Sequence, residues 1–411
     1  MQGVVVMAED RQALRSITWL EVFPSLRLFS ALRMALNFRA LVLAAIAIAG
    51  TAAGWRVCGA MFADPANSLL EAQISHNDIW PWDLPLPPPP PVDELSRIDT
   101  WWRQSPLLMA WSEISRPFKQ MYEAPTFAGF AYLLSCGLWS LVVWSFFGGA
   151  ITRQAAVTIA REENQSWSKL AGFVRSRLGA YFVAPLFPIG GTFLAAAFLA
   201  LLGLAMRSGL GVLAAGVLWP LVLLGGFMMA FLLIGLFFGW PLMWGAISAE
   251  GTDSFGALSH SYSYVYQRPL RYLVYAVMAA LIGVLGWFLV SLFATWILEL
   301  TRWAVSWGSG TARVDAVIAR EDLGQLGNFG AGLVQFWNNC LKTVAFGFIF
   351  SYFWSATTVI YFLLRRLVDA TEIDEVFLPE EQELHGLPPL KTGPDGVPAA
   401  ADDPAAAGDD S

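Results

Sequence analysis

Six stretches of this sequence are long and apolar enough to cross a lipid bilayer, and no other feature limits the fold so strongly. A helix needs about 20 predominantly apolar residues to cross the hydrocarbon core. Within that core the backbone must satisfy its own hydrogen bonds, so only helices and closed barrels span it. We therefore expect an all-α membrane protein, a bundle of six transmembrane helices. The predicted spans are residues 40–61, 127–151, 182–205, 211–246, 270–298 and 344–364.

The composition agrees with residence in a membrane. Hydrophobic residues make up 56% of the chain and charged residues 14%, and the mean hydropathy is +0.53. Soluble domains have about 25% charged residues. The 19 tryptophans suit the headgroup level, where an apolar ring and a polar N–H are both satisfied. No basic cluster accompanies the net charge of −7, which argues against nucleic acid as a partner. The partner that the composition predicts is the lipid bilayer.

The fourth stretch, residues 211–246, is long for a single crossing and contains Pro220 and Pro241. A second interpretation divides it into two spans. Gly225-Gly226 in its middle offers no polar residues with which a turn could reach water, so we favour one tilted or kinked helix.

The arginines and lysines beside the spans predict the orientation. They precede the first span, separate the second from the third, and follow the sixth, so six crossings place all three groups on one side of the membrane. The positive-inside rule makes this side cytoplasmic, with both termini inside. We therefore expect a multi-pass protein of the bacterial cytoplasmic membrane. The groups are Arg11, Arg15, Arg27, Arg33 and Arg39; Arg153, Arg161, Lys169, Arg175 and Arg177; and Arg365 and Arg366.

An amphipathic helix precedes each odd-numbered span. Apolar residues recur at helical spacing within segments 1–39, 152–181 and 247–269, and a short break separates each helix from its span. In the third copy, Pro269 opens the span as a first-turn residue. Helices of this kind lie in the membrane interface with the apolar face down. The pattern indicates duplication of a helical hairpin.

Two extracytoplasmic segments and a tail complete the predicted organisation. Segment 62–126 contains an extended proline run at 87–91, followed by a tryptophan-rich, partly helical stretch that we expect on the outer leaflet. Segment 299–343 is also rich in aromatic residues. The acidic segment 365–411 ends in Pro, Ala, Gly and Asp and is predicted to be largely disordered. The tail and the external segments are the candidate surfaces for a protein partner.

No motif in the sequence identifies a catalytic reaction. A glycine run from Gly324 to Gly332 has no preceding strand, so we interpret it as a flexible connector and not as a nucleotide-binding loop. Neither a metal site nor any cofactor is predicted. The predicted spans contain no charged residue in their cores, which argues against an ion-coupled pump. Cys58 and Cys340 both lie near predicted outer ends of spans, which leaves open whether they pair.

The candidate polar cluster lies at the cytoplasmic mouth of the fourth span. Glu250 and Asp253 could coordinate a cation or pair with Arg268 and Arg271. A helix cap at Asp253 and ion pairing at the membrane interface explain the same residues without a ligand.

The residues around this cluster resemble a known family. Glu250 to Tyr262, then Arg268 to Tyr272, are similar to a recurring pattern in bacterial integral membrane families related to the membrane domain of glycerophosphodiester phosphodiesterases, and 358–365 resembles the way these families end their last span. The large Trp- and Pro-rich external segment departs from that pattern, and no phosphodiesterase domain follows. The resemblance implies a helical membrane bundle and transfers no catalytic residue.

Two functional hypotheses follow from the sequence. The first is a non-enzymatic membrane scaffold or subunit in envelope organisation, because interfacial helices and an acidic tail occur without a chemical site. The second is a transporter or lipid-handling permease for an apolar or amphipathic molecule, because hairpins are duplicated and prolines interrupt the fourth span. The sequence leaves Met1 and Met7 open as the start.

Overall fold

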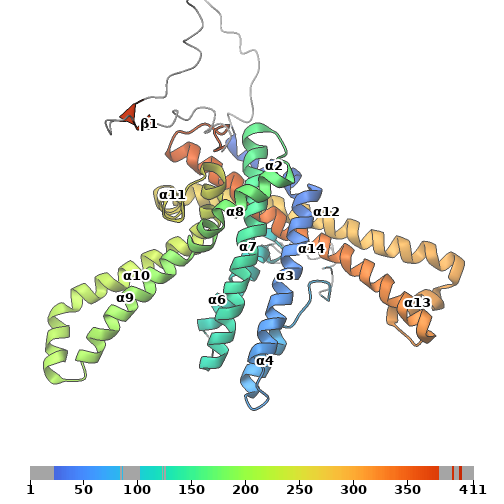
Figure 1. Cartoon of the computed structure of the whole chain (residues 1–411), viewed down its shortest axis with the longest axis horizontal. Helices are drawn as coiled ribbons and strands as arrows, with labels where there is room; N and C mark the ends of the chain where they lie inside the picture. The colour runs from blue at the N-terminus through green and yellow to red at the C-terminus, as the bar shows by residue number, and fades with distance from the viewer. Residues whose placement is uncertain are drawn as a thin grey trace, which may run out of the picture.

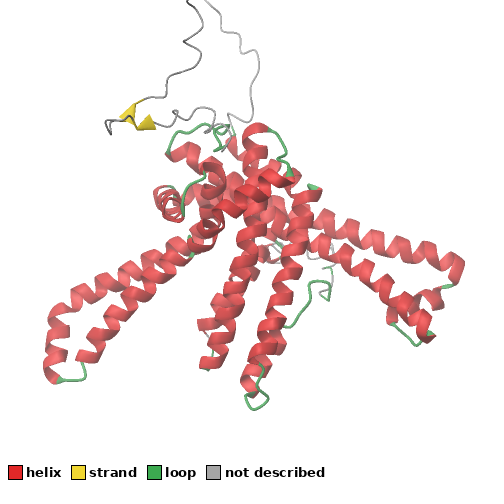
Figure 2. Ribbon diagram, viewed as in Figure 1, coloured by secondary structure: helices red, strands yellow, loops and turns green. Residues whose placement is uncertain are grey.

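The computed structural model describes residues 23–83, 86, 102–122, 124, 126–378, 391–392 and 398–399. Helices account for nearly all of this part of the chain (Figure 2). The elements are η1 (Pro24–Arg27), α2 (Leu28–Ala35), α3 (Phe38–Phe62), α4 (Ser68–Asn77), α6 (Pro106–Tyr122), α7 (Phe127–Arg161), α8 (Trp167–Val183), α9 (Leu186–Ala205), α10 (Gly209–Glu250), α11 (Ser254–Gln267), α12 (Pro269–Ser309), α13 (Thr311–Ala319), α14 (Gly324–Val368), β1 (Lys391–Thr392) and its antiparallel partner β2 (Pro398–Ala399). The proline run at 87–91 lies outside the described residues.

The prediction of an all-α membrane protein with six spans is confirmed. Six helical stretches are long and apolar enough to cross a membrane, and the fourth is the single helix α10, with both of its prolines inside it. The stretches are Phe38–Phe62, Phe127–Arg161, Trp167–Ala205, Gly209–Glu250, Pro269–Ser309 and Gly324–Val368.

Short helices introduce the odd-numbered spans, as the hydrophobic spacing predicts. Helix α2 leads into α3, α8 into α9, and α11 into α12. Local chemistry places each break: the Asn37 side chain accepts a hydrogen bond from the Arg39 N–H at the start of α3, and Pro269 is the first residue of α12. The three short helices gather at one end of the molecule, which we call the hub (Figure 1).

Helix α14 is the centre of the fold. In its most apolar 18-residue window, 94% of the residues are buried, compared with 6% in the corresponding window of α10. Its buried face is strongly aromatic, and the ring of Trp354 stacks on Trp244 of α10 at a centroid distance of 4.3 Å. Gly148 of α7 permits this stack, because a Cβ there would lie 2.7 Å from Trp244 and 2.8 Å from Trp354. The hub half of α14 therefore holds α7 and α10 together.

The spans diverge with distance from the hub. Figure 1 shows the α9–α10 hairpin and the α12–α13–α14 arm extending in opposite directions, with α3, α4, α6 and α7 between them. The α9–α10 hairpin is exposed along most of its length and presents large apolar side chains such as Leu194, Phe198 and Leu213. Such a surface is stable only in an apolar solvent.

Two expectations from the sequence differ from the structure. The glycine run from Gly324 to Gly332 forms the first turns of α14 and is not a flexible connector. Helix propensity is low at glycine, but the apolar residues that continue from the sixth span extend the helix through it. The outer segment 299–343 is thus largely the continuation of α12 and α14, joined through α13. Cys58, Cys136 and Cys340 are all free thiols.

Arg153 joins the hub to segment 370–378, which follows α14. Its side chain is fully buried, donates to the carbonyl oxygens of Ser248 (2.7 Å) and Phe377 (2.8 Å), and places its guanidinium 4.0 Å from the ring centroid of Phe173. A buried cation with these partners connects α7, α8, α10 and segment 370–378.

We expect Arg153→Met to destabilise the protein by about 2–4 kcal/mol, because two buried carbonyl groups lose their donor. Denaturation of the purified protein in detergent micelles measures this change. The matched control is Arg207→Met at the exposed turn between α9 and α10, which should shift stability by less than about 0.5 kcal/mol. Equal stability of Arg153→Met and wild type would contradict the assignment of Arg153 as the hub's organising cation.

Candidate functional site

Helix α6 enters the interior of the bundle. We expected this tryptophan-rich stretch on the outer leaflet, but α6 packs against α7, α12 and α14 and touches α10 through Trp111 and Phe237. Ser105, the residue before α6, is fully buried, and its hydroxyl donates to the carbonyl of Ala280 on α12 (3.3 Å). The prediction was wrong because the charged residues of α6 resemble those of a surface helix, whereas its apolar residues face other helices.

The depth of α6 follows from its neighbours on α7. The ring of Phe118 lies against Gly137, ten residues after α7 begins at Phe127, which corresponds to about 15 Å along the helix axis. The hydrocarbon core is about 30 Å thick. Glu113, Arg116 and Lys119 therefore lie beside the apolar part of α7, the position that a re-entrant helix would have, and we refer to α6 as the re-entrant helix.

Proline positions fit this role. Pro106 begins α6, where no intrahelical donor is needed. Pro117 lies inside the helix and has no N–H to offer the carbonyl of Glu113. Irregular backbone at membrane depth is tolerated where it is buried in protein or lines a cavity. Part of α6 is buried against other helices, and part of it lines a cavity.

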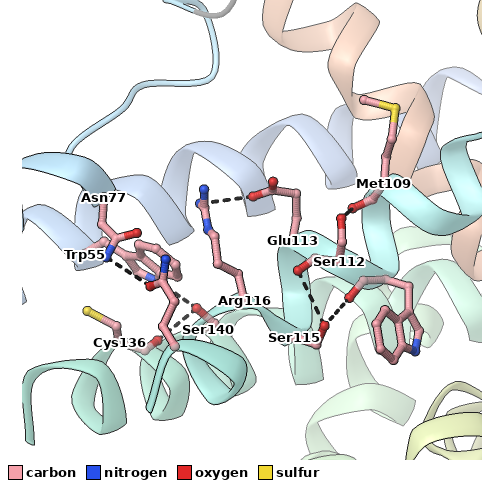
Figure 3. Close-up of polar contacts among 11 residues, drawn as sticks. Trp55, Asn77, Met109, Ser112, Glu113, Ser115, Arg116, Cys136 and Ser140 are labelled. Atoms are coloured by element: carbon pink, nitrogen blue, oxygen red, sulfur yellow. Dashed lines mark hydrogen bonds and ion pairs between the residues drawn. The ribbon is translucent and has the colours of Figure 1, made fainter. Parts of the chain in front are cut away.

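A cavity of about 190 Å³ lies between α6 and helices α3, α7 and α14. Its wall is mostly apolar, and we call it the polar cavity after the five polar residues in its described lining, which are Thr51, Asn77, Glu113, Arg116 and Ser140. Arg116 and Glu113 form an ion pair in it, with 3.0 Å between guanidinium nitrogen and carboxylate oxygen. The Arg116 guanidinium also lies 4.8 Å from the ring centroid of Trp55, and the Trp55 N–H donates to the Ser140 hydroxyl (2.8 Å). Figure 3 shows these side chains converging from α3, α6 and α7.

Two buried polar atoms in this cavity have no hydrogen-bond partner: Asn77 Oδ1 and Arg116 Nε. Asn77 is only 4% exposed, and its amide nitrogen donates to Gln73 O (3.1 Å) and Gln120 Oε1 (3.2 Å). These two acceptors fix the orientation of the amide, so its oxygen is the free atom. Both atoms are enclosed by the protein, and an unpaired buried polar group costs about 1–3 kcal/mol.

An apolar groove of about 370 Å³ lies on the opposite face of α6, towards α9 and α10. Ile114 lines both spaces. Aromatic and aliphatic side chains form almost all of the groove. Lys119 is the one charged residue in its described lining, with its ammonium 4.3 Å from the Trp111 ring centroid. The Trp111 N–H reaches across to the carbonyl of Phe237 on α10 (3.3 Å). The re-entrant helix thus separates a polar cavity from an apolar groove.

The contact between Trp111 and Phe237 provides a test of the re-entrant position. Their ring centroids are 4.5 Å apart. In a background without the three native cysteines, we expect Trp111→Cys and Phe237→Cys to be joined by a short bifunctional thiol reagent in native membranes. Trp111→Cys with Trp303→Cys, on the distal arm, serves as the control pair. If α6 lies on the membrane surface, neither pair will cross-link.

The four residues of the predicted polar cluster are not brought together as one site. Glu250 pairs with Arg365 (3.1 Å) and His260 (3.4 Å) and accepts a hydrogen bond from the Tyr361 hydroxyl. Asp253 caps α11 by accepting from the Gly256 N–H (2.8 Å). Arg268 and Arg271 are exposed at the start of α12. Among the described residues, no group of three His, Cys, Asp or Glu side chains is placed to hold a metal ion.

The partners of Glu250 make it part of the hub. Tyr264, beside this network, donates to Asp369, and burial raises the pKa of its hydroxyl, so it remains a donor. Arg365 also donates to the carbonyl of Glu375 (2.8 Å). The network therefore fastens the end of α14 and segment 370–378 to α10 and α11.

We expect Glu250→Gln to lower the unfolding free energy by about 1–2 kcal/mol, because Glu250 and Arg365 are less than one-fifth exposed. Arg268→Gln, at an exposed position near the same helices, should change it by less than about 0.5 kcal/mol. Denaturation in detergent compares the two. A larger loss for Arg268→Gln would argue for the cluster predicted from sequence.

Comparison with protein-family models, with curated protein sequences and with solved structures finds no match. The resemblance to glycerophosphodiester phosphodiesterase membrane domains stays a prediction.

Proposed function

We propose that this protein is a transporter or lipid-handling permease for an amphipathic molecule, and that α6 is the element its substrate contacts. The observation that carries the proposal is the re-entrant helix with a polar cavity on one face and an apolar groove on the other. A molecule with a polar end and a hydrocarbon part matches both environments.

The ion pair on α6 supports this function. Charged side chains inside a bilayer are costly and mark substrate pathways in membrane proteins. Glu113 and Arg116 have side-chain exposures of 47% and 34%, so both face open space while paired. A purely structural pair would be expected to be enclosed by its neighbours. The absence of charge from the cores of the predicted spans, which argued against an ion-coupled pump, does not extend to α6.

We further propose that the hub faces the cytoplasm of a bacterial inner membrane. The arginines and lysines of α2, α8 and the end of α14 gather there, as the positive-inside rule requires. The polar cavity then lies towards the opposite leaflet, so substrate would enter from the extracytoplasmic side. The scaffold hypothesis is less well supported, because it assigns no role to a polar cavity inside the bundle.

Movement of a fluorescent phospholipid analogue between the leaflets of reconstituted vesicles tests the proposed function. We expect wild type to accelerate this movement and Glu113→Leu to slow it about tenfold or more, since Arg116 would lose its partner at membrane depth. The control is Glu299→Leu, an exposed carboxylate on the α12 arm. Equal rates with and without wild-type protein, for lipids of several headgroups, would overturn the proposal.

A further inference from the structure

We propose that Cys58 of α3 and Cys136 of α7 form an oxidisable thiol pair, which a small external disulfide converts into a covalent bond between the two helices. This site of modification is independent of the proposed transport function. The packing register of α3 against α7 is the observation that carries it.

Two contacts on either side of the cysteines fix this register. The Trp55 N–H donates to the Ser140 hydroxyl (2.8 Å), and the rings of Phe62 and Tyr132 meet edge to face at a centroid distance of 6.2 Å. One helical turn along α3 therefore corresponds to one turn in the opposite direction along α7, and residues three or four positions apart share a face. The two cysteines lie between these contacts, one turn from each, and so they face each other.

The two thiols also contact each other. Each is a hydrogen-bond partner of the other, and Cys58 packs against the apolar cluster that contains Cys136. Glycine brings the helices close here, because a Cβ at Gly54 would lie 1.8 Å from Trp139 Nε1. A disulfide requires two side chains that point towards each other, which is the arrangement of this pair.

The exposure of the two thiols assigns their roles. Cys58 is partly exposed and Cys136 is buried. The Cys58 thiolate attacks a disulfide R–S–S–R, whose S–S bond breaks, so that a mixed disulfide forms and one R–S⁻ leaves. Cys136 then attacks the Cys58 sulfur and releases the second R–S⁻. The protein gives up two electrons and two protons, and R–S–S–R becomes two R–SH.

The bond closes a loop of chain that contains α4 and α6. Trp55 and Ser140, one turn from the cysteines, line the polar cavity, so the bond also fastens α3 to α7 at the wall of that cavity. The pair lies in the part of α3 that extends away from the hub (Figure 1). In the orientation proposed above, this part faces the periplasm, which is an oxidising compartment.

The test treats full-length protein in native membranes with oxidised glutathione and follows its three cysteines by mass spectrometry of the intact chain and of its peptides. We expect wild type to lose the mass of two hydrogen atoms and to yield a peptide in which residues 58 and 136 are linked. Cys340→Ala should behave in the same way. Cys136→Ala should instead retain glutathione on Cys58, because the second thiol that releases it is missing.

The matched control is Cys58→Ala, in which the buried Cys136 should take up no glutathione. Wild type and Cys340→Ala keep both members of the pair, so the test stands even if a variant within the pair folds poorly. Absence of the link between residues 58 and 136 in wild type, or a link from Cys58 to Cys340 in its place, would overturn the proposal. Lipid movement plays no part in this measurement, so its result is separate from that of the transport test.

Discussion

The rest of the structure depends on the packing of aromatic residues around α14. The hub half of α14 is buried, so its neighbours must fit its large rings, and Gly148 and Gly245 provide that fit against Trp354 and Tyr361. No hydrophobic driving force separates lipid from protein in a bilayer, so close packing and hydrogen bonds hold membrane helices together. Here the contacts concentrate at the hub, which leaves the outer halves of the spans free to diverge.

This concentration of contacts creates the space that α6 fills. Spans that separate away from the hub cannot close around one another, and a helix of 17 residues enters between them from the open side. Its turns contact α7, α12 and α14, Trp111 reaches α10, and other side chains of α6 line the cavity and the groove. The same geometry that makes the bundle open therefore produces its candidate binding site.

The spans and the hub helices could be predicted from the sequence because each is determined locally. Apolar runs define the spans, and Asn37 and Pro269 place the breaks before α3 and α12. The position of α6 could not be predicted in this way, because it depends on Gly137 and Gly283, which come from distant parts of the chain. Glu250 illustrates the same limit: it is an obvious candidate in the sequence, but its cationic partner is Arg365, which lies on another span. One signal was present, since Ser105-Pro106 marks a helix start ahead of an amphipathic stretch.

Because α10 is so long, its tilt depends on the thickness of the bilayer. Its 42 residues extend about 63 Å, roughly twice the hydrocarbon core, so the helix must tilt. The far part of α10 is surrounded by few protein contacts, whereas residues 240–249 are buried in the hub. A helix longer than the hydrocarbon core accommodates a change in membrane thickness by changing its tilt. Trp240 and Trp244, in the buried part of α10, also line the apolar groove, so a change in the tilt of α10 would alter the shape of that groove.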